Sequence, residues 1–222
     1  MFLKFGLWTG LSTISLLAID FIERLAINNF LDSQVLGFYL TVFAMFSYVY
    51  MPFQLISNIF LSFYLKDWKE SSKSVVERIE RNTIISIFVF LSASFMIYWF
   101  YDSIIINFYG VQYLGLHKDI LVYFILVFVL KLIYSMTGTL SFISNNPIFL
   151  SISLFYSLIM SIILNYLLVP VYGIKGVLIS AIITKSLLLS VLYWQYYKSG
   201  IKFSIKYFVL LILVLLTFLF FI

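Results

Sequence analysis

The stretch DILVYFILVFVLKLIYSMTGTLSFI, residues 119–143, decides the fold class of this chain. Its only charges are Asp119 at the start and Lys131 at the centre. A helix of about 20 residues crosses the hydrocarbon core of a bilayer, which is about 30 Å thick. The stretch is far longer than a membrane-spanning strand of about 10 residues, and it lacks the alternation of polar and apolar residues of such strands. It therefore predicts a transmembrane helix.

Six further apolar runs flank this stretch, each long or nearly long enough to cross a bilayer. The run around Pro52 is expected to be kinked or tilted. We predict an all-α integral membrane protein of about seven transmembrane helices, forming one membrane domain over residues 1–222. The predicted helices cover residues 5–30, 35–64, 82–101, 119–143, 148–168, 174–197 and 207–222.

The composition indicates that the solvent of this chain is largely lipid. Hydrophobic residues make up 64% of it and charged residues 10%, whereas a soluble domain carries about 25% charged residues. The chain has no cysteine, which excludes disulfides, thiolate metal sites and cysteine nucleophiles. The first run is too long for a cleavable signal peptide and carries both acidic and basic side chains.

The basic residues predict the orientation, because lysine and arginine gather in cytoplasmic loops. With the N-terminus in the cytoplasm, nine of them fall in inside segments and two, Lys118 and Lys175, in outside segments. This predicts a cytoplasmic N-terminus and a periplasmic C-terminus. The longest inside segment, residues 66–81, is expected to be a solvated connector.

A surface helix is the alternative for this segment. Its charges alternate in sign, and Val75, Val76 and Ile79 would then face the membrane.

Charged residues inside the predicted spans are the best pointers to function. Lys131 and Lys185 lie roughly 15 Å or more from either end of their helices, beyond the reach of a lysine stem of about 6 Å. Each amine is therefore expected to face a carboxylate or a hydrated cavity. The first run supplies Asp20 and Glu23, together with Arg24.

Two interpretations of these charges remain open. In the first, Asp20 and Arg24 pair at i,i+4, and Glu23 meets a lysine from another helix. In the second, which we favour, the charges line a cavity, because three bases exceed two carboxylates and leave a positive interior suited to an anionic substrate group.

Polar stripes extend the candidate site. Gln54 and Asn58, beside Pro52, are typical of a kinked helix that acts as a gate. The substrate-binding residues that we predict are Arg24, Lys131, Lys185, Gln54 and Asn58, with Asp20 and Glu23 as charge partners. A second stripe, in the fifth run, is explained equally well by helix packing. It comprises Ser153, Ser157, Ser161 and Asn165.

Signatures of enzymes are missing from the sequence. The only histidine, His117, falls in a predicted outside loop and is better explained as an interfacial residue than as a base. Gly173 and Gly176 indicate a tight turn that leads into a helix. We therefore predict no enzymatic activity, no metal and no cofactor.

Three stretches together resemble a known family. They are IERLAINNFLDSQVLGFY at 22–39, NFYGVQYLG at 107–115 and NYLLVPVYGIKGVLISAIIT at 165–184. The third is the most specific, since it resembles the segment N-x-x-L-x-P-x-Y-G-I-x-G of polysaccharide-export flippases. These are the O-antigen flippases of the Wzx type, within the superfamily of multidrug, oligosaccharidyl-lipid and polysaccharide exporters. The pattern resembles the second half of such a protein.

The resemblance implies transport of an oligosaccharide linked to undecaprenyl pyrophosphate across the bacterial cytoplasmic (inner) membrane, for lipopolysaccharide biosynthesis. It also implies basic residues in a central cavity that meet the pyrophosphate, and Arg24 matches the motif arginine. Family members have two lobes and 12 to 14 helices, so this chain is expected to supply one lobe and to be truncated or split.

The expected partners are membrane lipid, the lipid-linked oligosaccharide, and a separate N-terminal lobe or a second copy of the chain, with no nucleic acid. Two alternatives stay open. One is a remnant that inserts without transporting. The other is a drug exporter of the same superfamily, coupled to cations through Asp20 and Glu23.

Overall fold

A computed structural model describes residues 2–108 and 119–203 of the chain, all of which fall in helices or in the short connections between them. No strand occurs in these two ranges. The six helices are α1 (Phe2–Phe30), α2 (Ser33–Asp67), α3 (Ser72–Phe108), α4 (Asp119–Ile143), α5 (Pro147–Tyr172) and α6 (Ile174–Lys198).

Five of these helices, α2 to α6, are long and apolar enough to cross a membrane. The all-helical class is thus confirmed for the described residues, and the five apolar helices are consistent with a multi-pass membrane protein, but the expected count of about seven spans is not confirmed. The charged helix α1 is not among the five, and the predicted span 207–222, like His117, lies outside the described residues.

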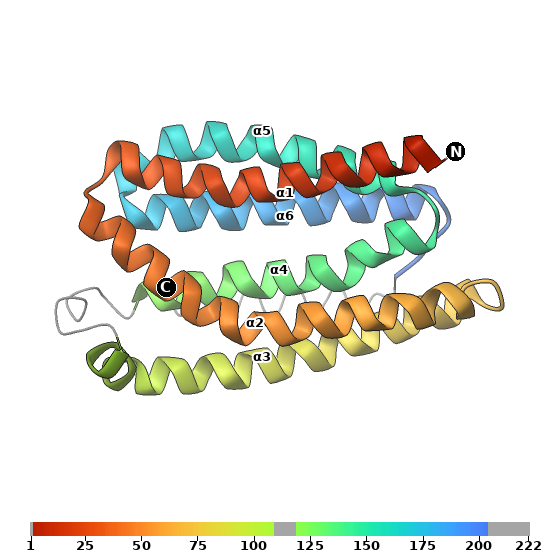
Figure 1. Cartoon of the computed structure of the whole chain (residues 1–222), viewed down its shortest axis with the longest axis horizontal. Coiled ribbons are helices and arrows are strands. Elements are labelled where there is room, and N and C mark those ends of the chain that lie inside the picture. Colours follow the sequence, from red (N-terminus) through yellow and green to blue (C-terminus); the bar gives the residue numbers. More distant parts are fainter. Residues whose placement is uncertain (1, 109–118, 204–222) are drawn as a thin grey trace.

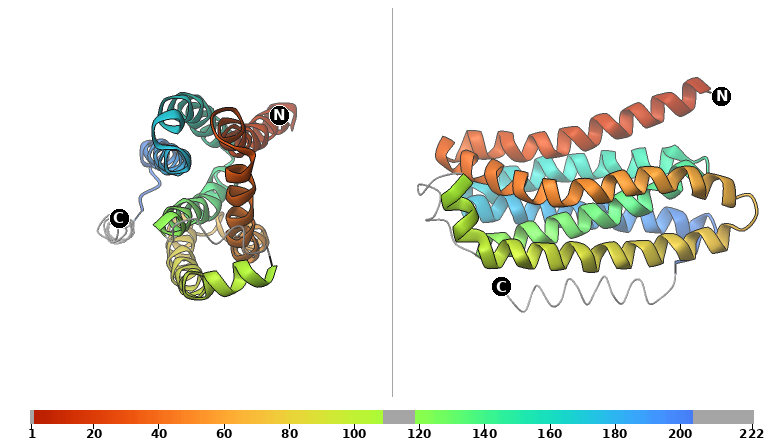
Figure 2. Two further views of the ribbon diagram at one scale, coloured as in Figure 1. Left: turned by 90° about the vertical axis from the view of Figure 1, so that its left-hand side faces the viewer. Right: turned by 60° about the horizontal axis from the view of Figure 1, so that its bottom comes forward.

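The helices form two groups of three, as Figure 1 shows. One group contains α1, α5 and α6, the other α2, α3 and α4, and the end-on view in Figure 2 separates them. Helix α2 contains Pro52 and passes obliquely from beside α1 to beside α3, bending along its length (Figure 1). The two groups meet where α4 packs against α6.

Helix α4 lies at the centre of the molecule and is buried over most of its length. Aromatic rings fill the space between it and its neighbours α2 and α3. The ring of Phe46 stacks on Phe124 with centroids 6.1 Å apart, and Phe90 stacks on Phe128 at 6.4 Å. Because α4 is apolar on both faces, it packs against α2 and α3 within its own group and against α6 of the other group.

Small residues allow α5 and α6 to approach each other closely. Gly173, with φ of +58°, is the single residue between the two helices, and this conformation favours glycine. A Cβ on Gly176 would overlap the backbone oxygen of Leu168. The tight turn expected from these two glycines is confirmed.

The polar stripe of α5 is buried. Ser157 donates a hydrogen bond to the carbonyl of Ser153, and Asn165 donates one to the carbonyl of Ser161. Side chains that bond to their own helix present a compact surface to neighbouring helices, so packing accounts for most of this stripe.

Residues 66–81 differ from the expected connector. Only a short turn separates α2 from α3, because α3 already begins at Ser72. Val75, Val76 and Ile79 are buried in an apolar cluster with α4, α5 and α6 instead of facing solvent or lipid. Their spacing of one, three and four residues puts them on one face of a helix, which explains why this segment continues α3.

Candidate functional site

The five charges singled out in the predicted spans come together between α1, α4 and α6. Two ion pairs join four of them: Lys131 Nζ lies 2.8 Å from Asp20 Oδ2, and Lys185 Nζ lies 3.1 Å from Glu23 Oε1. Each lysine is therefore paired with a carboxylate, as expected from its central position in the predicted span. Helix α1 provides both acids and α4 and α6 one base each, so the pairs fasten three helices together.

The pair of Glu23 and Lys185 is the more deeply buried of the two. The Glu23 side chain is 1% exposed and that of Lys185 10%. The second carboxylate oxygen of Glu23 accepts a hydrogen bond of 2.6 Å from the hydroxyl of Tyr39 on α2. A buried carboxylate needs such partners, because burial without them costs several kcal/mol.

The pair of Asp20 and Lys131 is less enclosed, with side chains 21% and 15% exposed. The Lys131 amine also lies 5.2 Å from the ring centroid of Phe43, 5.7 Å from Phe128 and 5.8 Å from Tyr50. Aromatic faces attract cations at such distances. The Lys131 amine therefore has favourable contacts with aromatic rings in addition to its ion pair with Asp20.

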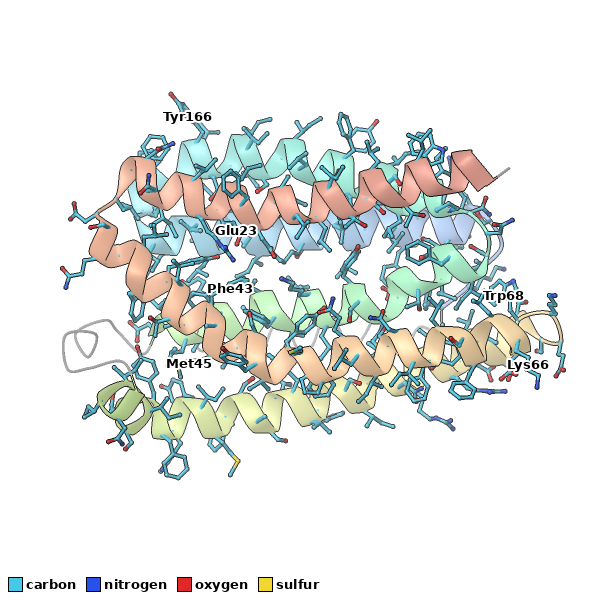
Figure 3. The ribbon with its side chains drawn as sticks, viewed as in Figure 1. Glu23, Phe43, Met45, Lys66, Trp68 and Tyr166 are labelled. Carbon is cyan, nitrogen blue, oxygen red and sulfur yellow. The ribbon has the colours of Figure 1, made fainter. Side chains whose placement is uncertain are left out.

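Arg24 is exposed, and among the described residues no carboxylate lies within ion-pair distance of it. Its guanidinium carbon lies 5.5 Å from the ring centroid of Phe43. The pairing of Asp20 with Arg24 expected at i,i+4 is absent, because Asp20 bonds to Lys131 instead. Figure 3 labels Glu23 on α1 and Phe43 on α2, which mark the two sides of this site.

The positive surplus expected from three bases and two acids is therefore located at one side chain. Both lysines are matched by carboxylates, and Arg24 carries the remaining charge at the exposed edge of the cluster. An anion that approached the cluster would meet this guanidinium first.

A small cavity adjoins both lysines. Its volume is about 20 Å³, enough for one water molecule. Asp20, Lys131, Lys185 and Thr184 are among the residues that line it. The Thr184 hydroxyl is buried, and no hydrogen-bond partner for it lies among the described residues. Among the described residues, this cavity beside the lysines is too small for the substrate group that the sequence predicts.

The structure places Gln54 and Asn58 apart from this cluster. Both are exposed on α2, whereas Ser57 between them is buried and donates a hydrogen bond of 2.9 Å to the carbonyl of Ser135 on α4. Tyr50, one turn before Gln54 on α2, lies nearer the charges, since its ring centroid is 5.8 Å from the Lys131 amine. The amides therefore belong to an outer face of the molecule.

Sequence reasoning missed the part played by Tyr39 and Phe43. Both lie in or just after the segment 22–39 that carries the family resemblance. Their spacing of four residues puts them on one face of α2, and their rings stack with centroids 5.9 Å apart. The available signal was the position of Tyr39 and Phe43 on one face of the helix that follows the charged helix α1. Such a face can contact the charged side chains.

No group of three or more histidine, aspartate or glutamate residues in the described ranges is arranged to hold a metal ion. In comparisons with known proteins, no family model, no curated protein and no solved structure matches the chain.

Proposed function

We propose that this chain is one lobe of a flippase that moves an oligosaccharide linked to undecaprenyl pyrophosphate across the bacterial cytoplasmic membrane. The observation that carries the proposal is the exposed Arg24 guanidinium beside two largely buried lysine–carboxylate pairs. An excess of fixed positive charge in a low-dielectric region favours an anionic ligand. The resemblance of segments 22–39, 107–115 and 165–184 to such flippases supports the same substrate.

The geometry supports an exchange of counterions as the binding step. Arg24 provides the first contact with the pyrophosphate. Lys131 then exchanges Asp20 for a phosphate oxygen, and the surrounding aromatic rings keep its amine in place. The deeper pair of Glu23 and Lys185 stays closed and holds α1 against α6.

We further propose that the outer face of α2 meets a partner, either a separate lobe or a second copy of the chain. Gln54 and Asn58 are exposed on a helix long and apolar enough to cross a membrane. Amides facing lipid have no hydrogen-bond partner there, which costs free energy. A partner helix or a bound headgroup would satisfy them.

The proposal is tested by binding. The purified full chain in detergent micelles is titrated with undecaprenyl pyrophosphate and with uncharged undecaprenol, and retained ligand is measured by native mass spectrometry. We expect Arg24→Gln to weaken binding of the pyrophosphate by about tenfold, because a charged hydrogen bond is lost. Lys175→Gln, which removes an exposed cation at the start of α6, is the control.

Two outcomes contradict the proposal. Equal affinity of the wild-type chain for the pyrophosphate and the alcohol would show that charge plays no part. Unchanged pyrophosphate affinity in the Arg24→Gln variant would remove this residue from the site. A chain that binds neither ligand fits the alternative of a remnant.

A cation-coupled drug exporter is the weaker candidate. It needs carboxylates that can take up a coupling ion, and Asp20 and Glu23 are each engaged by a lysine. The same titration distinguishes the two, since a drug exporter would retain a lipophilic cation such as ethidium in preference to the pyrophosphate.

A further inference from the structure

A second, larger cavity opens at the end of the bundle opposite Tyr166, near Trp68 (Figure 3). The turn between α2 and α3, the turn between α4 and α5, and the segment that follows α6 meet around it. Its volume is about 550 Å³, within the range of small-molecule sites. The residues that line it are Trp68, Ser72, Lys73, Val76, Ser144, Asn146, Ser199, Gly200, Ile201 and Lys202.

The polar groups of this cavity suit an anion. Lys73 and Lys202 supply two cations from different elements, and none of the described residues that line the cavity is acidic. The Ser72 hydroxyl and the second amide hydrogen of Asn146 add hydrogen-bond donors, whereas the Ser144 and Ser199 hydroxyls donate to backbone carbonyls of α4 and α6. Two ammonium groups that converge on one cavity without a carboxylate repel each other until an anion lies between them.

The other charges at this end of the bundle are mixed. Asp67, at the end of α2, is held by Arg78 at 2.6 Å, whereas Glu70 in the turn between α2 and α3 is exposed. Helices α3 and α5 begin at the cavity, and α2, α4 and α6 end at it, so the partial charges of the helix ends oppose one another. Lys73 and Lys202 therefore supply the positive charge of this cavity.

The position of the cavity points to lipid as the source of the anion. It lies where the helices long enough to cross a membrane begin or end, and Trp68 contributes an indole ring to its wall. Tryptophan concentrates at the headgroup level of membranes, and basic pockets between membrane helices bind anionic headgroups.

We propose that this cavity binds the phosphate group of an anionic phospholipid, between Lys73 and Lys202. The site is separate from the cluster around Arg24, and the inference does not depend on the proposed flippase function.

The test uses the purified full chain in neutral detergent, with dioctanoyl-phosphatidylglycerol as the lipid probe and inorganic phosphate as the soluble probe. Native mass spectrometry gives the affinity for each. We expect Lys73→Gln with Lys202→Gln to weaken lipid binding by about 30-fold, since each surface lysine adds about 1 kcal/mol. The matched control, Lys66→Gln with Lys69→Gln, removes two exposed cations from the same end outside the cavity, and lipid binding should stay unchanged.

The two probes distinguish the sources of the phosphate. Tight lipid binding with little displacement by phosphate supports a headgroup site. Full displacement by phosphate at low concentration would overturn the lipid assignment in favour of a soluble phosphate compound. Equal losses in the two double variants would overturn the site itself, because binding would then follow general surface charge. All four exchanged lysines lie at the surface, so an unchanged melting temperature confirms that each variant is folded.

Discussion

Lys185 on α6 and Glu23 on α1 are 162 positions apart in the sequence, yet the amine nitrogen lies 3.1 Å from a carboxylate oxygen. This ion pair joins α1 to α6 within the group formed by α1, α5 and α6. The opposite carboxylate oxygen reaches α2 through Tyr39. One carboxylate therefore bonds to two other helices, α6 and α2.

Replacement of Glu23 by Gln should destabilise the protein by about 3 kcal/mol, because it leaves the Lys185 ammonium buried without a counter-charge. The free energy of unfolding in mixed micelles, measured by titration with sodium dodecyl sulfate, checks this. The double variant Glu23→Gln, Lys185→Met should recover most of the loss. An equal loss in the single and double variants would show that the charge pairing is not the cause.

Replacement of Tyr39 by Phe should cost about 1.5 kcal/mol or more, since it removes a hydrogen bond to a charged acceptor. The ring itself, which packs 5.3 Å from Phe124, is kept. The same detergent titration measures the loss. Tyr48→Phe is the control, because Tyr48 is 73% exposed. Similar losses at both positions would contradict the assignment.

Replacement of Gly176 by Ala should destabilise the protein by about 1–3 kcal/mol, because the added methyl group would overlap the backbone of Leu168. In contrast, Gly10→Ala adds a methyl group with nothing within 4 Å, and alanine favours the helix by about 1 kcal/mol. Thermal unfolding of the two variants should move in opposite directions. A stable Gly176→Ala variant would mean that α5 and α6 are less closely packed.

Replacement of Asp20 by Asn should increase the affinity for undecaprenyl pyrophosphate by about tenfold, because it removes the anion that competes for Lys131. This prediction rests on the proposed function, and the native mass spectrometry titration measures it. Lower affinity in the Asp20→Asn variant would indicate that Asp20 orients the lysine instead of competing with the ligand.

The fold could be predicted largely from hydrophobic length. The stretch 119–143 coincides with α4, and the run 174–197 ends one residue before α6 does. The charges of residues 66–81 favour a solvated connector, which is wrong. The alternative of a helix agrees with the start of α3 at Ser72, but its apolar face meets other helices instead of the membrane. The three apolar residues that bury one face of it are recognisable only once α4, α5 and α6 are present to cover them.

The site could be predicted in its members but not in its pairings. The depth of Lys131 and Lys185 required partners, and both partners proved to be carboxylates of α1. The choice of Lys131 over Arg24 by Asp20 depends on tertiary structure. A pair at i,i+4 is worth a few tenths of a kcal/mol, whereas an unpaired lysine at membrane depth costs several, so the lysine takes the carboxylate.

The placement of both acids on α1 has a consequence for biogenesis. This helix leaves the ribosome before α4 and α6 do, so both carboxylates have been synthesised when each lysine arrives. A lysine at the centre of a helix adds about 2.5–3.5 kcal/mol to the cost of insertion by the translocon. A nascent chain that carries its counterions first lowers this cost for every base that follows, so the order of synthesis favours correct assembly.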